Sequence, residues 1–138
     1  MHYLEKIMKG IPDANPFFTL MGIEVVSVES GRAQLRMAVR PDMCNGVGWM
    51  QGGIFAALAD EAMALALYQV LEEGDGIATI SENTSFLKGA KDGTVIAEGR
   101  VIRKGRRVAF AEGEVREEGG EGTLLSRSAA SFAILSKP

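Results

Sequence analysis

Imidazole and thiol are almost absent from this chain, which carries one histidine and one cysteine among its 138 residues. The histidine, His2, lies in the first turn of the chain, where the ends of a domain usually fray. A central catalytic imidazole is therefore not expected, which excludes Ser-His-Asp hydrolases and most zinc sites. The lone Cys44 excludes an internal disulfide and indicates a reducing compartment, so we expect a cytoplasmic protein.

The chain also lacks a basic surplus and a long apolar leader. Its formal net charge is -3 and its pI is about 5.2, which argues against a partner nucleic acid, since phosphates require a basic face. Glu5, Lys6 and Lys9 interrupt the apolar residues of the first segment, so we expect no export signal. With 46% apolar and 24% charged residues, the composition predicts one globular domain over residues 1–138.

Hydrophobic periodicity predicts the elements of the first half. Apolar residues at helical spacing from Leu4 to Ile11 predict a short lead helix that Pro12 and Pro16 end. Alternation from Ile23 onward predicts two strands with a hairpin turn at Gly31. Residues 41–53 are rich in glycine, which predicts a loop.

The second half begins with the longest apolar segment, residues 54–71, which predicts a buried helix about 27 Å long at ~1.5 Å per residue. Asp60 and Glu61 within it disfavour a membrane span. Four strands are predicted after it, at 77–88, 94–104, 107–117 and 123–135, with glycine turns that indicate an antiparallel meander. We therefore expect an α+β fold in which a curved antiparallel sheet wraps around one long helix and leaves an edge free for dimerisation.

Two features of this helix carry possible chemistry. Residues 45–53 bring glycine-rich backbone into its start, where free N–H groups and the helix dipole suit an oxyanion, although Gly52 and Gly53 can equally serve close packing. Asp60 and Glu61 lie on an apolar helix and have to face a cavity, a subunit seam or a hydrogen-bonding partner. The simpler alternative is that both point to a solvated crevice or cap a neighbouring strand, and periodicity does not choose between the two residues.

The residues around these features resemble one family. Asn45 and the run Gln51-Gly52-Gly53, followed by Leu58-Ala59-Asp60, are similar to the signature of hotdog-fold acyl-CoA thioesterases of the phenylacetic-acid-degradation (PaaI-like) type. That signature reads Asn, a short gap, His-Gly-Gly, then Leu-Ala-Asp. The resemblance covers most of the chain and includes Asn15-Pro16-Phe17, residues 20–23, residues 83–87 and Gly105-Arg106-Arg107.

The resemblance implies roles for the residues that match it. Asp60 would be the nucleophile or general base, the Gly52 N–H would polarise the thioester carbonyl, and Asn45 would orient water or the thioester. Thr79, or Ser81 as the alternative, would lie near the carboxylate. Gln51 replaces the histidine of the family, and its amide can donate a hydrogen bond but cannot titrate.

The resemblance also implies the substrate contacts. The acyl groove would be lined by Gly53, Phe55, Leu58, Met63 and Phe86. The basic residues Arg103, Lys104, Arg106 and Arg107 would lie near the CoA nucleotide, because guanidinium groups bind phosphates bidentately, whereas their simpler interpretation is a solvated hairpin tip. No metal or cofactor is required, and no membrane is expected as a partner.

These observations predict hydrolysis of acyl-CoA at a subunit seam of a homo-oligomer, a dimer and then a dimer of dimers. The alternative is a hotdog protein that binds acyl-CoA or another apolar acid without turnover, which Gln51 favours. A hotdog dehydratase is disfavoured because those enzymes resemble this chain but require a central histidine.

Overall fold

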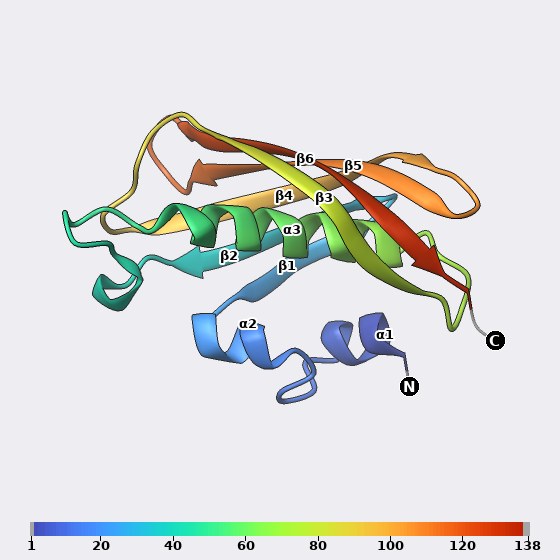
Figure 1. Ribbon diagram of the computed structural model, residues 1–138. Helices are drawn as coiled ribbons and strands as arrows, with labels where there is room; N and C mark the ends of the chain where they lie inside the picture. The colour runs from blue at the N-terminus through green and yellow to red at the C-terminus, as the bar shows by residue number, and fades with distance from the viewer. Residues whose placement is uncertain (1, 137–138) are drawn as a thin grey trace.

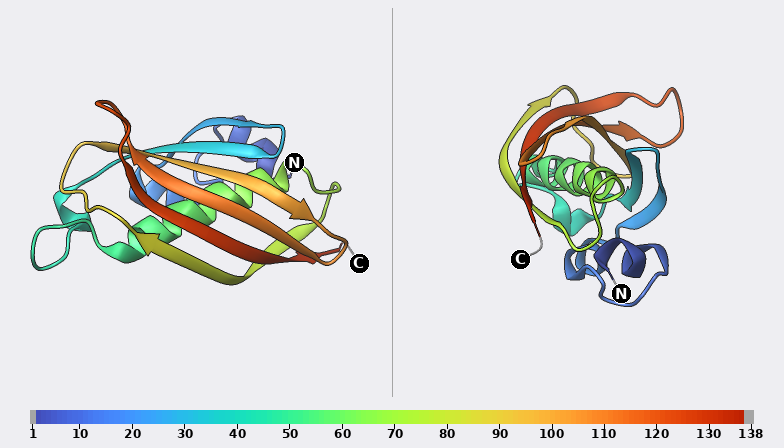
Figure 2. Two further views of the ribbon diagram at one scale, coloured as in Figure 1. Left: turned by 90° about the horizontal axis from the view of Figure 1, so that it is seen from above. Right: turned by 90° about the vertical axis from the view of Figure 1, so that its right-hand side faces the viewer.

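The computed structural model describes residues 2–136 and consists of a six-stranded antiparallel sheet curved around one helix (Figure 1). In chain order the elements are α1 (Tyr3–Met8), α2 (Pro16–Met21), β1 (Glu24–Glu29), β2 (Arg32–Ala38), a short 3-10 helix (Pro41–Met43), α3 (Gly52–Tyr68), β3 (Gly76–Phe86), β4 (Thr94–Lys104), β5 (Val108–Glu117) and β6 (Leu124–Leu135). The end-on view of Figure 2 shows the sheet closing around α3, with α1 and α2 outside on the side that the sheet leaves open. The predicted α+β architecture is confirmed.

The N-terminal segment contains a second helix that the sequence did not predict. Pro16 does not stop a helix but begins α2, because the first helical position needs no N–H donor. The side chain of Asn15 caps this helix by accepting from the N–H groups of Phe17 at 3.0 Å and Phe18 at 3.4 Å. Gly22 ends it in the left-handed region at φ 70°.

Helix α3 is the predicted buried helix with shifted ends. It begins at Gly52, two residues before the predicted start, because the Gln51 side chain caps it by accepting from the N–H of Gly53. It ends at Tyr68, three residues before the predicted end. Consequently Asp60 lies in its third turn.

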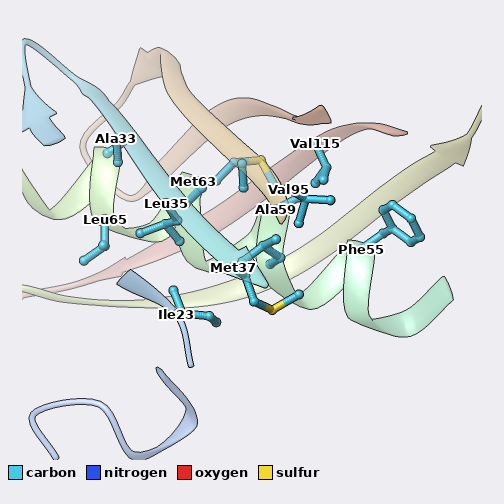
Figure 3. Packing of buried hydrophobic residues seen from close by; sticks show 14 of the residues in the cluster. Ile23, Ala33, Leu35, Met37, Phe55, Ala59, Met63, Leu65, Val95 and Val115 are labelled. Carbon is cyan, nitrogen blue, oxygen red and sulfur yellow. The ribbon is translucent and has the colours of Figure 1, made fainter. Parts of the chain in front are cut away.

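The core lies between α3 and the concave face of the sheet. Figure 3 shows residues of several elements packed together: Leu35 and Met37 of β2, Val95 of β4, Val115 of β5, and Ala59 and Met63 of α3. Strand β4 crosses α3 so closely that a Cβ at Gly99 would lie 2.4 Å from the backbone carbon of Ala62. Glycine at this position therefore permits the contact that encloses the helix.

The strand order is β1-β2-β4-β5-β6-β3, so the predicted meander is confirmed for β4, β5 and β6 but wrong for β3. Strand β3 pairs with β6 at the far edge, and residues 87–93 then lead back past the start of α3 to β4 (Figure 1). This crossover could not be predicted from the sequence, because a connection as short as residues 87–93 can either close a hairpin or lead to a more distant strand.

Strand β3 leaves one of its edges without a neighbouring strand, since it ends the sheet order. Most of its side chains are exposed, including the large apolar Ile80 and Phe86 at 58% and 57%. An unpaired edge with apolar side chains is a template for another strand. Across residues 2–136, none of the helices has both the length and the apolarity needed to span a bilayer.

Candidate active site

Asp60 points from α3 toward β3, where it meets a hydroxyl. The Thr79 hydroxyl donates a hydrogen bond of 2.9 Å to Oδ1 of this half-buried carboxylate. Burial raises the pKa of Asp60 above its ordinary value, and the bond from Thr79 opposes that rise. The site thus contains a carboxylate that is more basic than one in open water and is held by one donor.

The structure distinguishes Thr79 from Ser81, the alternative that the sequence left open. A bulge at Ile80 interrupts the pairing of β3 with β6. Thr79 lies opposite the fully buried Phe132 and therefore faces α3, whereas Ser81 lies opposite Ser131, on the other face of the sheet. Only the Thr79 hydroxyl contacts Asp60.

Glu61 points away from Asp60, toward the N-terminal helices. The Asn15 amide donates to Glu61 Oε2 at 3.3 Å and to the hydroxyl of Tyr3 at 2.8 Å, and the Tyr3 ring packs edge-on against Tyr68 at 5.1 Å. Burial and the charge of Asp60 raise the pKa of Glu61 to about 7, against the opposing bond from Asn15. The two adjacent carboxylates therefore have different surroundings, and only Asp60 faces β3.

The N-terminus of α3 leaves one backbone donor unused. The N–H of Gly53 binds the side chain of Gln51 and the N–H of Ile54 binds the carbonyl of Gln51. The N–H of Gly52 donates to no acceptor within residues 2–136. Gly52 therefore provides a free donor at the positive end of the helix dipole, whereas the amide of Gly53 is already occupied.

A cleft of about 290 Å³ opens beside Gly52. Its lining consists of Met50, Gly52, Phe55, Phe86, Leu87, Lys88 and Gly89. The rings of Phe55 and Phe86 meet edge-on with centroids 6.1 Å apart, so this wall is aromatic. The expectation that Met63 and Leu58 line the groove is wrong for this structure, because both side chains are buried in the core at 0% and 1% exposure.

Two of the expected polar residues serve the local backbone. Asn45 Oδ1 accepts from the N–H groups of Val47 at 3.0 Å and Trp49 at 3.1 Å, which orders the loop before α3. Gln51 caps α3 through its side-chain oxygen. The amide nitrogen of each residue donates to no acceptor within residues 2–136 and is free to contact a ligand.

Within one chain the acid and the free amide do not come together. Asp60 lies eight residues after Gly52 in α3, so the two are separated by about 12 Å along the helix axis at ~1.5 Å per residue. A single thioester carbonyl cannot contact both at that separation. One chain by itself therefore does not present the two groups to the same carbonyl.

The basic cluster of Arg103, Lys104, Arg106 and Arg107 also lies apart from Gly52. All four are exposed at the hairpin between β4 and β5. Figure 1 shows this hairpin at the end of the molecule opposite to the start of α3. No ion pair between residues 2–136 involves the four side chains.

One acidic residue near Asp60 was missed by the sequence analysis. Glu82 of β3 is half-buried, and burial and the charge of Asp60 raise its pKa. It lies opposite the buried Ala130, so it faces α3 as Thr79 does. An acid among the alternating residues of a strand was the available signal. In the part of the chain that the structure describes, His, Cys, Asp and Glu form no group of three or more that could hold a metal ion.

Comparison with known proteins identifies the family. The family model described as the thioesterase superfamily matches residues 48–123, more than half of the chain. Acyl-coenzyme A thioesterase 13 of Homo sapiens is 28% identical over 109 residues, which cover 78% of this chain and 77% of that protein. The 1,4-dihydroxy-2-naphthoyl-CoA hydrolase of Listeria monocytogenes is 26% identical over 107 residues, 78% of this chain and 87% of that enzyme.

The solved structures agree. A phenylacetic acid degradation-related protein of Ralstonia eutropha JMP134 superposes with a TM-score of 0.85 at 25% identity, over 96% of this chain and 99% of that one. The fold, the sequence signature and the family match thus indicate the same family. This chain belongs to the thioesterase superfamily and is a hotdog-fold thioesterase of the PaaI-like type.

Proposed function

We propose that this thioesterase hydrolyses acyl-CoA to the free acid and CoA at a site that two copies of the chain build together. The observation that carries the proposal is the separation of about 12 Å between Asp60 and the free N–H of Gly52 in one helix. The two relatives named above are an acyl-coenzyme A thioesterase and a 1,4-dihydroxy-2-naphthoyl-CoA hydrolase, and both names support a CoA thioester as the substrate.

The free edge of β3 supports the dimer. Pairing of β3 with its own copy about a two-fold axis extends the sheet and covers Ile80 and Phe86. The axis reverses the direction of α3 in the second chain, so Gly52 of one chain approaches Asp60 of the partner subunit. The same reversal brings the basic hairpin of the partner to the Gly52 end, where its guanidinium groups suit the phosphates of CoA. A dimer of dimers and a cytoplasmic location complete the proposal, the latter supported by the lone Cys44.

The chemistry follows from these positions. The thioester carbonyl accepts a hydrogen bond from Gly52, where the helix dipole stabilises the oxyanion that forms on attack. Asp60 of the partner subunit takes a proton from water, whose oxygen bonds to the carbonyl carbon. The C–S bond then breaks and the thiolate of CoA takes that proton. Direct attack by Asp60, with an anhydride that water cleaves, is the other route open to the same carboxylate.

The first experiment removes the carboxylate. We expect Asp60→Asn to lower kcat for thiol release from acyl-CoA by about 100-fold or more, because an amide is neither a base nor a nucleophile. The substitution keeps the size of the side chain and can still accept from Thr79. Equal rates in the two proteins would remove Asp60 from the chemistry.

The second experiment tests whether two chains share the site. Gly52→Pro deletes the free N–H at a position where proline is accepted in a helix, and Gln51 already has the extended conformation that precedes proline, with φ -61° and ψ 134°. A Cβ at this position lies 3.3 Å from the Phe86 ring, so Gly52→Ala, which adds the Cβ and keeps the N–H, is the matched control. Asp60→Asn and Gly52→Pro are each expected to be inactive alone. An equal mixture, unfolded and refolded together, should recover about a quarter of the wild-type activity, because half of the dimers then hold one intact site. No recovery in the mixture, under conditions in which refolded wild type regains its activity, would contradict the two-chain site.

The second candidate function is capture of acyl-CoA or another apolar acid without turnover. The observation that favours it is the Gln51 side chain, whose oxygen caps α3 where the family has a histidine. Acyl-CoA recovered intact after hours with the protein would support capture, whereas prompt release of thiol would exclude it.

A further inference from the structure

One carboxyl beside the site has no part in the proposed mechanism, that of Glu82. The register of β3 with β6 places Glu82 opposite Ala130 and Thr84 opposite Ser128, and both of those β6 residues are buried. Glu82 and Thr84 therefore face α3, on the same side of the sheet as Thr79. The carboxyl is half-buried and belongs to the edge strand on which the dimer depends.

Neutral hydroxyl groups alone hold this carboxyl. The hydroxyls of Thr84 and Ser128 lie 2.8 Å apart, and Thr84 donates to Glu82 Oε2 at 3.2 Å. Thr84 donates its one hydroxyl proton to Glu82, and the bonds from the Thr84 and Ser128 hydroxyls both lower the pKa of Glu82 against the rise that burial causes. Glu82 has no Lys, Arg or His ion-pair partner among residues 2–136. A group that lacks a cation and is already half-buried tolerates little further loss of water.

Glu82 lies between the two ends of the site. Thr79 binds Asp60 at one end, and at the other end the Phe86 ring is 3.3 Å from the position of a Cβ on Gly52. If Gly52 of one chain meets Asp60 of the other, the two-fold axis passes midway between them, near Ala56 of α3 and the middle of β3. The two Glu82 carboxyls then lie on the seam between the two reacting centres.

We infer that Glu82 determines which acyl groups the enzyme accepts, by keeping extended aliphatic chains out of this seam and restricting the substrates to short acyl groups and to those that carry a hydroxyl. The inference rests on the proposed two-chain site. An acyl group that outgrows the cleft of about 290 Å³ beside Gly52 has to extend along the seam. Methylene groups would displace water from the Glu82 carboxyl without donating a hydrogen bond in its place. A hydroxyl on the acyl group would instead donate a hydrogen bond to this carboxyl.

The test compares kcat/KM for butanoyl-, octanoyl- and dodecanoyl-CoA and for hydroxylated octanoyl-CoA. Glu82→Met replaces the carboxyl by an apolar side chain of similar length. We expect it to raise the dodecanoyl-to-butanoyl ratio of kcat/KM by about tenfold or more and to abolish the preference for the hydroxylated chain. Glu82→Gln, which keeps the shape and hydrogen bonding, should shift the ratio less and replaces Glu82→Met if that variant does not fold.

The matched control is Ser85→Met, because Ser85 lies on the same strand opposite Arg127 and faces away from α3. It should leave the chain-length profile as in the wild type. An unchanged ratio in the Glu82 variants, with butanoyl-CoA still hydrolysed, would overturn the inference. If no acyl-CoA releases thiol, the proposed hydrolysis fails instead, and calorimetric binding of the same panel to the wild type and Glu82→Met still reveals whether Glu82 selects by chain length.

Discussion

Glu61 shows how a single side chain makes stability depend on pH. Its carboxyl has an ordinary pKa of 4.5 and one of about 7 in the folded protein, chiefly because it is buried beside Asp60. The folded protein thus binds this proton more tightly than the unfolded chain. The stabilisation is fully present below about pH 4.5 and is lost as the pH rises through about 7.

We therefore expect Glu61→Gln to stabilise the protein at pH 8 by about 2 kcal/mol, after allowance for the partial access of water to this group. The glutamine oxygen still accepts from Asn15, so the contact with the N-terminal segment is kept. Urea unfolding of both proteins at several pH values measures the effect. The exposed Glu121 provides the control as Glu121→Gln, and a wild-type stability that does not fall between pH 5 and 8 would contradict the prediction.

Thr79 acts on the reaction through Asp60. Its hydrogen bond lowers the pKa that burial raises, so Thr79→Val should raise the pKa of Asp60. The acidic limb of the kcat profile is then expected to move to higher pH, so that kcat falls most on the acidic side of the profile. Thr79→Ser keeps the hydroxyl and should retain the wild-type profile. A limb that stays in place in Thr79→Val would show that this hydroxyl does not tune the carboxylate.

At the scale of elements, the contact between α3 and β4 depends on one missing side chain. A Cβ at Gly99 would lie 2.4–2.5 Å from the backbone of Ala62 and Met63, and backbone atoms of a helix cannot move aside as a flexible side chain can. We expect Gly99→Ala to lower the free energy of unfolding by about 3 kcal/mol or more, because α3 must separate from the sheet. Thermal unfolding measures it. Gly46→Ala is the control, since no atom lies within 4 Å of its added Cβ, and equal unfolding temperatures would refute the prediction.

At the scale of the whole molecule, activity should depend on concentration. If the site needs two chains, the specific activity is expected to fall on dilution below the dissociation constant of the dimer, in parallel with the fraction of dimer measured by sedimentation. The thermal midpoint should rise with protein concentration for the same reason. Constant specific activity across a range in which the dimer dissociates would contradict the two-chain site.

Much of the architecture could be predicted from the order of the residues because it depends on local periodicity. The alternation around Leu35 predicts a strand with one buried face, and the apolar run around Leu58 predicts a buried helix, whatever lies next to them. The place of β3 could not be predicted in this way. The residues of β3 predict a strand, but they do not predict which strand lies beside it. In the folded protein that neighbour is β6.

For the site, the order of the residues was enough to predict which groups are available: two adjacent acids on an apolar helix, a glycine-rich helix start and no central imidazole. The folded chain was needed to show that Asp60 faces Thr79 while Glu61 faces Asn15, and that Glu82 lies near enough to Asp60 to feel its charge. Helix geometry fixes the directions in which two adjacent side chains point. The groups that they contact belong to segments distant in the chain, and the fold brings these segments to the helix. The distance of about 12 Å between Asp60 and Gly52 follows from helix geometry, but that it separates an acid from an unused N–H appears only once the fold is known.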